Sequence, residues 1–152
     1  MKRILFVCHG NICRSPMAES VLDHMLRSRG FSGQFIVRSA ATSNEELGNP
    51  VHYGTVRMLK QHNIPLIEHR AVALKFDDYD RYDLIIGMDE ANRRNILRIL
   101  GSDPENKISC LLDFTDEPRD IADPWYTGDF EATYADITRG CEALIDRVLC
   151  AK

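Results

Sequence analysis

The chain has 152 residues, of which 44% are hydrophobic and 28% are charged, with a net charge of −4 at pH 7. This composition is typical of one globular domain, here 1–152, that buries its own core, and it disfavours a disordered or coiled-coil chain. A mildly acidic protein lacks the basic face that nucleic acids and membrane surfaces attract, so we expect neither as a partner.

The cysteines and the N-terminus indicate the compartment. The cysteines are five in number with no CxxC pair, and the histidines are scattered, so we expect neither a disulfide framework nor a metal site. The apolar run after 1–3 is about five residues long, too short for a signal peptide, and no segment is long enough to cross a membrane. We therefore expect a cytoplasmic protein, with Cys110 and Cys141 as small buried core residues.

Short apolar runs alternate along the chain with segments of helical periodicity. The runs 3–8, 35–41, 83–88 and 107–114 predict strands, and the continuous apolar run RILFVC is typical of a strand buried on both faces. Helices are predicted after the first strand, at 51–62, at 89–100 and around 130–148. This order predicts a small doubly wound α/β fold, a four-stranded parallel sheet with helices on both faces. Ligands of such sheets bind beyond the carboxyl ends of the strands, where Cys8 is expected.

Residues 8–15, CHGNICRS, connect the first strand to a helix whose first turn suits Pro16. Glycine and asparagine tolerate unusual backbone angles best, so a tight loop here can turn successive N–H groups inward around an anion. An arginine fork can then hold two oxygens of a tetrahedral anion, and a cysteine in this environment is stabilised as a nucleophilic thiolate. The segment therefore predicts that Cys8 attacks a phosphate held by a loop of His9, Gly10, Asn11, Ile12, Cys13 and Arg14.

An ordinary strand-to-helix turn with an incidental cysteine and arginine is the alternative for this segment. We favour the catalytic interpretation, because the strand, glycine, asparagine, arginine, serine and proline all suit one geometry.

The stretch VCHGNICRSPMAE resembles the signature of the low-molecular-weight protein tyrosine phosphatases. The likeness continues in SAATS (39–43), GNP (48–50), GMDEAN (87–92), DPWY (123–126) and the closing helix, so it spans nearly the whole chain. The resemblance implies a four-stranded parallel sheet flanked by helices, and hydrolysis of phosphotyrosine and aryl phosphate monoesters through a phosphocysteine. It also implies that no metal or other cofactor is needed.

A thiolate that attacks a phosphate ester needs an acid to protonate the leaving group. By composition Asp123 is one acid among several in a loop, and a solvated acidic loop is the simplest interpretation. The resemblance assigns the role to Asp123, because Asp-Pro followed by two aromatic residues matches the family's general-acid motif. Pro124 disfavours helix at Asp123 and would help to present the acid from a loop. The same carboxylate would then activate the water that hydrolyses the phosphocysteine.

Several other residues are expected to support the loop. Ser15 could donate a hydrogen bond to the thiolate or cap the following helix, and both roles remain open. By resemblance, Asn11 holds the loop through its side chain, Ser39 bonds that asparagine, and His69 supports the loop serine. Taken alone, His69 would be a surface residue. Asp89 also matches a family position, which helix capping explains equally well.

Cys13 is a second cysteine in the loop, five residues after Cys8. Across a tight loop the two could come within disulfide range on oxidation. Family members with this second cysteine form a reversible bond that shields the nucleophile from irreversible oxidation, so the resemblance predicts Cys13 as a redox partner. The alternative is a small residue that packs under the loop.

The substrate pocket is expected to be lined by Ile12, Glu45, Trp125 and Tyr126. The two aromatic faces suit a phosphophenyl ring, and a deep loop would exclude the shorter phosphoserine, although these rings could also simply anchor their loop to the core. Glu45 and Glu46 stand where many relatives have an aromatic residue, and two carboxylates would disfavour acidic peptides. Phosphotyrosine-containing proteins or peptides are therefore the expected partners, bound by a monomer.

Three other functions compete with this one. A branch of the family hydrolyses phosphoarginine, but it carries threonine at the position of Ile12, and isoleucine has no hydroxyl to orient the attack. Arsenate reductases of this fold need two further cysteines after the third strand, and residues 76–100 contain none. A non-catalytic phosphate-binding module would lose Cys8 or Asp123, and both are present here.

The sequence also departs from many relatives at Val72, where they have an arginine. The contacts that support the loop near this position are therefore expected to differ.

Overall fold

The computed structural model describes residues 1–150, within which four strands form one parallel sheet in the order β2-β1-β3-β4. The strands are β1 (Lys2–Cys8), β2 (Phe35–Ala41), β3 (Leu84–Gly87) and β4 (Ile108–Cys110). The helices are α1 (Arg14–Ser28), α2 (Tyr53–Gln61), α3 (Asp78–Arg81), α4 (Glu90–Leu100), α5 (Pro124–Thr127) and α6 (Phe130–Leu144), with a 3₁₀ helix η1 (Leu111–Phe114) and a π-helical turn η2 (Ile145–Leu149). The predicted parallel α/β fold is confirmed.

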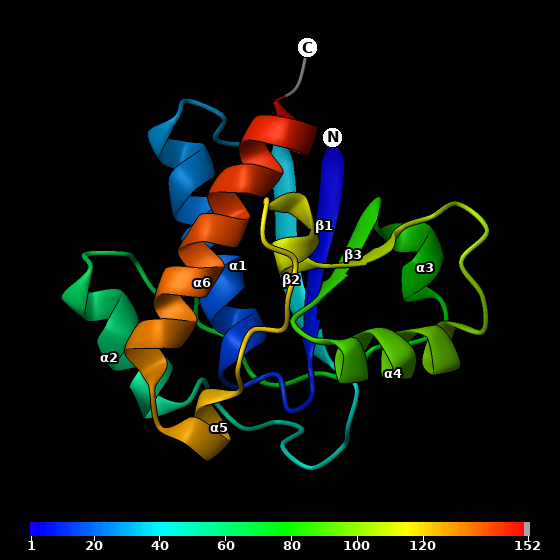
Figure 1. Ribbon diagram of the computed structural model, residues 1–152, viewed down its shortest axis with the longest axis horizontal. Coiled ribbons are helices and arrows are strands. Elements are labelled where there is room, and N and C mark those ends of the chain that lie inside the picture. The colour runs from blue at the N-terminus through cyan, green and yellow to red at the C-terminus, as the bar shows by residue number, and fades with distance from the viewer. Residues whose placement is uncertain (151–152) are drawn as a thin grey trace.

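Helices cover both faces of the sheet (Figure 1). The helices α1, α2 and α6 lie on one face, and α3 and α4 lie on the other. Strand β1 lies inside the sheet, so Ile4, Phe6 and Cys8 join the core beneath α1 and α6, while Leu5 and Val7 join the core on the α4 side. All five are at most 3% exposed. Burial on both faces explains why this strand is apolar at every position from Ile4 to Cys8.

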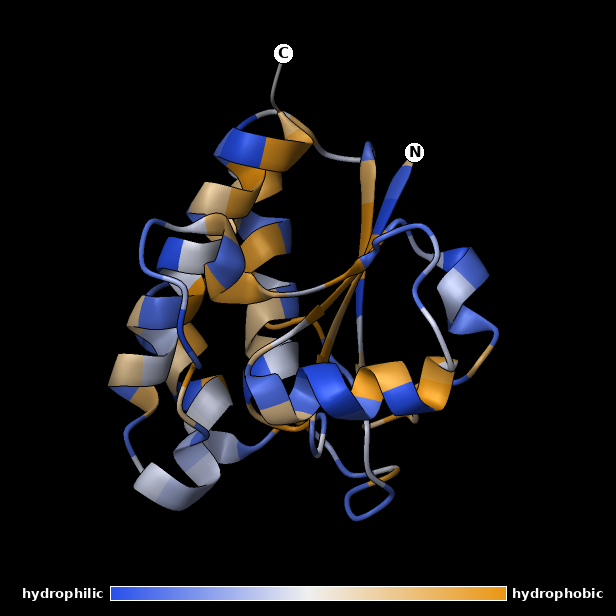
Figure 2. Ribbon diagram, turned by 45° about the vertical axis from the view of Figure 1, so that its right-hand side comes forward, coloured by the Kyte–Doolittle hydropathy of each residue, from blue (hydrophilic) through white to orange (hydrophobic). Residues whose placement is uncertain are grey.

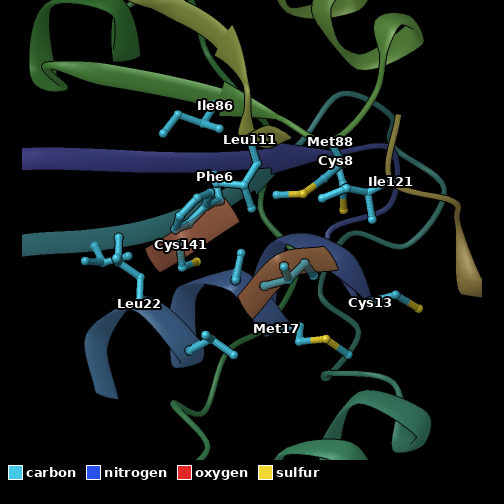
Figure 3. Close-up of a cluster of buried hydrophobic side chains, with 14 of the residues drawn as sticks. Phe6, Cys8, Cys13, Met17, Leu22, Ile86, Met88, Leu111, Ile121 and Cys141 are labelled. Carbon is cyan, nitrogen blue, oxygen red and sulfur yellow. The ribbon is translucent and has the colours of Figure 1, made fainter. Parts of the chain in front are cut away.

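The larger core lies between the sheet and the α1–α6 pair. Phe6, Met17, Leu22 and Cys141 gather there, and each is fully buried (Figure 3). Hydrophobic residues likewise follow the strands and the inner faces of the helices (Figure 2). Cys110 is 4% exposed, so the prediction that Cys110 and Cys141 are buried core residues is confirmed.

Two predicted elements have different boundaries in the structure, and two short helices were not predicted. The strand expected at 107–114 ends at Cys110, because the Asp113 carboxylate accepts the Cys110 N–H at 2.9 Å and folds the chain into η1. The helix expected at 51–62 begins only at Tyr53, after His52 caps it. Helices α3 and α5 have four residues each, too few for a periodic pattern to reveal.

The carboxyl ends of the strands point to one end of the molecule, the lower end in Figure 1. Cys8 pairs in register with Ala41, and Gly87 pairs with Cys110, so the segments that follow these residues emerge side by side. Helix α5 lies at the same end. Among residues 1–150, no helix combines the length and apolar character that a bilayer span requires.

Candidate active site

The loop at 8–14 is wrapped around the Sγ atom of Cys8. Asn11 has a left-handed φ of 59°, which asparagine tolerates better than most residues, and its N–H donates to Cys8 Sγ at 3.3 Å. The Cys8 carbonyl accepts the Thr42 N–H at 3.0 Å, which ties the loop to the end of β2. Gly10 has no positive φ, so the unusual backbone that the sequence suggested for both residues is confined to Asn11.

A directed chain of hydrogen bonds leads to the thiol. His69 Nε2 donates to Asn11 Oδ1 at 2.6 Å, and Asn11 Nδ2 donates to Ser15 Oγ at 2.8 Å. The Ser15 hydroxyl, whose lone pair accepts that bond, can then donate to Cys8 Sγ at 3.0 Å. Cys13, not Ser15, stands at the N-cap position of α1, so the capping interpretation of Ser15 is wrong. Two donors, one backbone and one hydroxyl, therefore face the sulfur.

The outer part of this network differs from the one that the resemblance implied. The Ser39 hydroxyl donates to Glu19 Oε1 at 2.6 Å and lies 3.3 Å from His69 Nε2, so it reaches Asn11 only through the histidine. His69 in turn reaches Ser15 only through Asn11. Burial raises the pKa of Glu19 to about 7, and burial also lowers the pKa of His69. Sequence reasoning missed Glu19, although a carboxylate on the inward face of α1 was a signal.

Arg14 is held beneath the loop by residues from distant parts of the chain. It is 2% exposed, and its Nη1 donates to Asp89 Oδ2 at 2.7 Å and to the Ile121 carbonyl at 2.8 Å, while Nη2 lies 3.4 Å from Asp123 Oδ2. Burial alone would lower the pKa of the guanidinium, but Cys8 and Asp89 raise it above its usual value. The other oxygen of Asp89 caps α4, so both interpretations of Asp89 hold.

The predicted catalytic, loop and pocket residues meet around one cavity of about 80 Å³ that opens to solvent. Residues 8–14, Glu45, Asp123, Trp125 and Tyr126 all line it. Asp123 is the N-cap of α5, with an extended backbone, and its Oδ1 accepts the Trp125 N–H at 3.0 Å. The Asp123 carboxyl is thus presented at the end of a loop directly before Pro124, as the sequence predicts.

The rim of the cavity contains a pair that sequence reasoning missed. His9 Nε2 lies 3.0 Å from Glu45 Oε2, which links the phosphate-binding loop to the 42–50 segment. The Val72 side chain is half exposed, while its N–H donates to Asn11 Oδ1 at 3.1 Å. A backbone bond therefore supports the loop at this position, whichever side chain the residue carries.

Cys13 lines the cavity at the end of the loop and is 5% exposed. Burial, reinforced by the neighbouring Cys8 and Asp123, raises the pKa of its thiol to about 12. Both loop cysteines are free thiols, and their pairing on oxidation stays a prediction. Within 1–150, no three His, Cys, Asp or Glu side chains are grouped so that they could hold a metal ion.

In this parallel α/β sheet, the first crossover places a backbone N–H and a hydroxyl on a cysteine sulfur, beside a buried arginine and a carboxylate. This arrangement is typical of cysteine-dependent phosphatases. The family model for low molecular weight phosphotyrosine protein phosphatase matches residues 3–151. The chain belongs to this family, and it is accordingly a phosphoric monoester hydrolase of the protein tyrosine phosphatase class.

Individual relatives agree with the family assignment. The chain is 40% identical over 150 residues to the low molecular weight protein-tyrosine-phosphatase PtpA of Staphylococcus haemolyticus, covering 98% of this chain and 95% of that protein. It is similar to the crystal structure of YfkJ from Bacillus subtilis, with a TM-score of 0.92, 37% identity and coverage of 95% and 92%. It is also similar to DARP, a Drosophila arginine phosphatase, with a TM-score of 0.85, 31% identity and coverage of 95% and 96%.

Proposed function

We propose that the protein hydrolyses phosphotyrosine in proteins or peptides in two steps, with Cys8 as the nucleophile, Arg14 as the phosphate ligand and Asp123 as the acid and base. One observation carries the proposal. The sulfur of Cys8 faces the Asn11 N–H at 3.3 Å and the Ser15 hydroxyl at 3.0 Å, inside a cavity that Arg14 and Asp123 also line. Donors aimed at a sulfur stabilise its anion, and a cation beside it attracts a phosphate.

In the first step the phosphate enters the loop, where backbone N–H groups and the Arg14 guanidinium bind its non-bridging oxygens. The contacts of Nη1 with Asp89 and Ile121 fix the plane of the guanidinium before substrate arrives. The Cys8 thiolate attacks phosphorus, the S–P bond forms, and the P–O bond to the tyrosine breaks. Asp123 gives its proton to the leaving phenolic oxygen.

In the second step the Asp123 carboxylate takes a proton from a water that attacks the phosphocysteine. The S–P bond breaks, inorganic phosphate forms, and the sulfur leaves as a thiolate. The Ser15 hydroxyl and the Asn11 N–H, which face this sulfur, stabilise the departing charge. The chain of bonds from His69 through Asn11 keeps the Ser15 hydroxyl turned toward the sulfur.

The cavity walls support an aromatic phosphate ester. Trp125 and Tyr126 are 55% and 80% exposed at the mouth, where their faces can flank a phenyl ring, and Ile12 adds an apolar contact. Phosphoarginine is the second candidate, supported by the similarity to the Drosophila arginine phosphatase. The side chain of Ile12 lacks the hydroxyl that this activity would use, which favours phosphotyrosine.

The test combines a substrate panel with trapping of the intermediate. Peptides of one sequence carrying phosphotyrosine, phosphoarginine or phosphoserine are compared by kcat/KM, and ³²P-labelled substrate is quenched during turnover. We expect phosphotyrosine to be turned over fastest and label to appear on Cys8, with none on the Cys8→Ser variant. Faster turnover of phosphoarginine would show that the protein is an arginine phosphatase. Hydrolysis by the Cys8→Ser variant would exclude the covalent mechanism.

We also propose that Cys13 protects the nucleophile. Peroxide would oxidise the Cys8 thiolate to a sulfenic acid, and the Cys13 thiol would displace the hydroxyl as water and form a disulfide. The raised pKa of Cys13 keeps it a thiol, so Cys8 is oxidised first. Mass spectrometry after mild peroxide should find the 8–13 disulfide, and sulfinic acid on Cys8 without that bridge would contradict the proposal.

A cytoplasmic monomer is proposed as the working form. All five cysteines are free, and all but Cys150 are buried, which suits a reducing compartment and gives no disulfide framework. Gel filtration across a hundredfold range of concentration should give a constant size near 17.3 kDa. A size that grows with concentration would overturn the monomer.

A further inference from the structure

His52 connects the phosphate-binding loop to helix α2. Its backbone N–H donates to the Ile12 carbonyl at 2.8 Å, and its Nδ1 accepts the Gly54 N–H at 3.0 Å. The second bond makes the side chain the N-cap of α2. The position of His52 is therefore fixed by the loop that surrounds Cys8.

The imidazole ring of His52 connects two further elements. It stacks on Phe130 of α6, with ring centroids 5.2 Å apart and planes 17° apart, and it meets Trp125 of α5 edge to face at 5.7 Å and 76°. Gly54 permits this arrangement, because a Cβ at that position would lie 2.4 Å from Cζ of Phe130. The close approach of α6 to the start of α2 thus places the His52 ring where Trp125 can pack on it.

The segment that carries the acid has few other attachments. The hydrogen bonds that the structure gives to residues 124–128 all run within 123–129. Pro124 is buried, but Trp125 is 55% exposed, and the ring that it contacts is His52. Since the Trp125 N–H also donates to Asp123 Oδ1 at 3.0 Å, a displacement of Trp125 would turn the carboxyl of Asp123.

We propose that His52 is a positioning residue for Asp123, acting through the contact between its ring and Trp125. The proposal rests on the proposed function, in which Asp123 protonates the leaving group. Loss of the ring would let α5 move and the carboxyl leave the line of the P–O bond, while the loop and the sulfur stay in place. A misplaced catalytic group slows only the chemistry that needs it.

Varying the leaving group of the substrate distinguishes a positioning role of His52 from a purely structural one. Hydrolysis of an ester with a poor leaving group such as phenol needs the proton, whereas dinitrophenolate departs without it. The quantity to measure is kcat/KM for a series of aryl phosphates, because it covers all steps up to formation of the phosphocysteine. A residue that only stabilises the fold would lower all members of the series equally.

Two variants divide the functions of the side chain. His52→Asn keeps an oxygen that can cap α2 but removes the ring, and His52→Phe keeps a ring but removes the cap. We expect His52→Asn to lower kcat/KM about tenfold for phenyl phosphate and less than about twofold for dinitrophenyl phosphate. We expect the leaving-group dependence of His52→Phe to follow that of the unmodified protein.

His62 supplies the matched control at the other end of α2. Its ring stacks on Tyr134 of α6 at 3.9 Å and 11°, the same kind of α2–α6 contact, but it does not meet α5. His62→Ala should lower the melting temperature and leave the leaving-group dependence unchanged. If His52→Asn fails to fold, Trp125→Ala removes the same contact from the other side and should give the same steepening.

The Asp123→Asn variant separates failure of this proposal from failure of the proposed function. If Asp123→Asn does not steepen the leaving-group dependence, Asp123 is not the acid and both proposals fall. If it does, while His52→Asn and Trp125→Ala match the unmodified protein, only the role of His52 is overturned. Equal steepening in His52→Asn and His52→Phe would also overturn that role, because it would point to the helix cap and not to the ring.

Discussion

The two segments that meet in the active site are built in opposite ways. The loop at 8–14 is mostly buried, with Asn11 fully covered and Arg14 2% exposed, and its polar groups bond residues as distant as His69 and Ile121. The segment at 123–128 is mostly exposed and bonds chiefly within itself. The fold itself therefore fixes the sulfur, whereas side-chain packing places the acid. Changes in the loop should affect both stability and activity, and changes in the acid segment should affect activity alone.

Replacing the arginine of the loop tests this contrast most severely. Arg14→Lys cannot hold two phosphate oxygens as a fork, and it loses contacts with Asp89 and Ile121, so we expect kcat/KM to fall about a thousandfold, with a lower melting temperature. Arg119→Lys is the control. Arg119 donates two hydrogen bonds to the Asp136 carboxylate through Nη1 and Nη2, but this pair lies on the surface and outside the active site. A loss of less than tenfold in Arg14→Lys would show that the loop binds phosphate without the fork.

Removing the acid tests the other half of the comparison. Asp123→Ala should lower kcat/KM for phosphotyrosine about a hundredfold. The melting temperature should stay within the range of surface variants, because the Asp123 carboxyl is only partly buried and caps a helix of four residues. Asp116→Ala, from the same acidic region but with a side chain 89% exposed, should change neither quantity. Strong destabilisation by Asp123→Ala would contradict the contrast between the two segments.

Breaking the hydrogen-bond chain inside the loop should have an intermediate effect. Asn11→Ala removes the link between His69 and Ser15 and places alanine at a φ of 59°. We expect the free energy of unfolding to fall by about 1–2 kcal/mol from backbone strain and lost bonds, and kcat about tenfold. Asn63→Ala is the matched control, because Asn63 also has a φ of 59° but lies outside the site. Equal kinetic effects in the two variants would remove Asn11 from the mechanism.

The buried carboxyl beneath the network should make stability depend on pH. Burial raises the pKa of Glu19 from 4.5 to about 7, so between these values the folded protein keeps a proton that the unfolded chain has lost. The contribution of the protonated Glu19 side chain to the free energy of unfolding is therefore fully present below pH 4.5, and it is lost as the pH rises through 7. Glu19→Gln can still accept from Ser39 but does not titrate. Its free energy of unfolding, relative to that of the unmodified protein, should therefore rise by about 1–3 kcal/mol from about pH 5 to about pH 8. Urea unfolding at both pH values gives this difference, and parallel curves would contradict it.

The rim should show the smallest effect. Glu45→Gln changes an exposed contact with His9, which contributes less than about 1 kcal/mol to stability. We expect kcat/KM for a small aryl phosphate to change less than about threefold, and a phosphotyrosine peptide with flanking lysines to lose more than one with flanking glutamates. Equal changes for the two peptides would show that Glu45 does not contact residues beside the phosphotyrosine.

The sequence predicts short-range features of the site better than its supports. The apolar run before Cys8, the left-handed turn at Asn11 and the extended backbone before Pro124 were all predictable from neighbouring residues. The sequence suggested a longer fourth strand, which failed because the Asp113 side chain competes for a backbone N–H and turns the chain into η1. Helix α5 was too short to predict, although its flanking residues were recognised.

By itself the sequence determined the parallel α/β fold, the cysteine at the end of its first strand and the loop that follows. Those features depend on periodicity and backbone preference, which adjacent residues set. Only the tertiary structure decided that Asp89 and Ile121 fix Arg14, that Ser39 joins Glu19 to His69, and that the His52 ring meets Trp125. Such contacts join residues far apart in the chain, so they exist only once helices and sheet have packed.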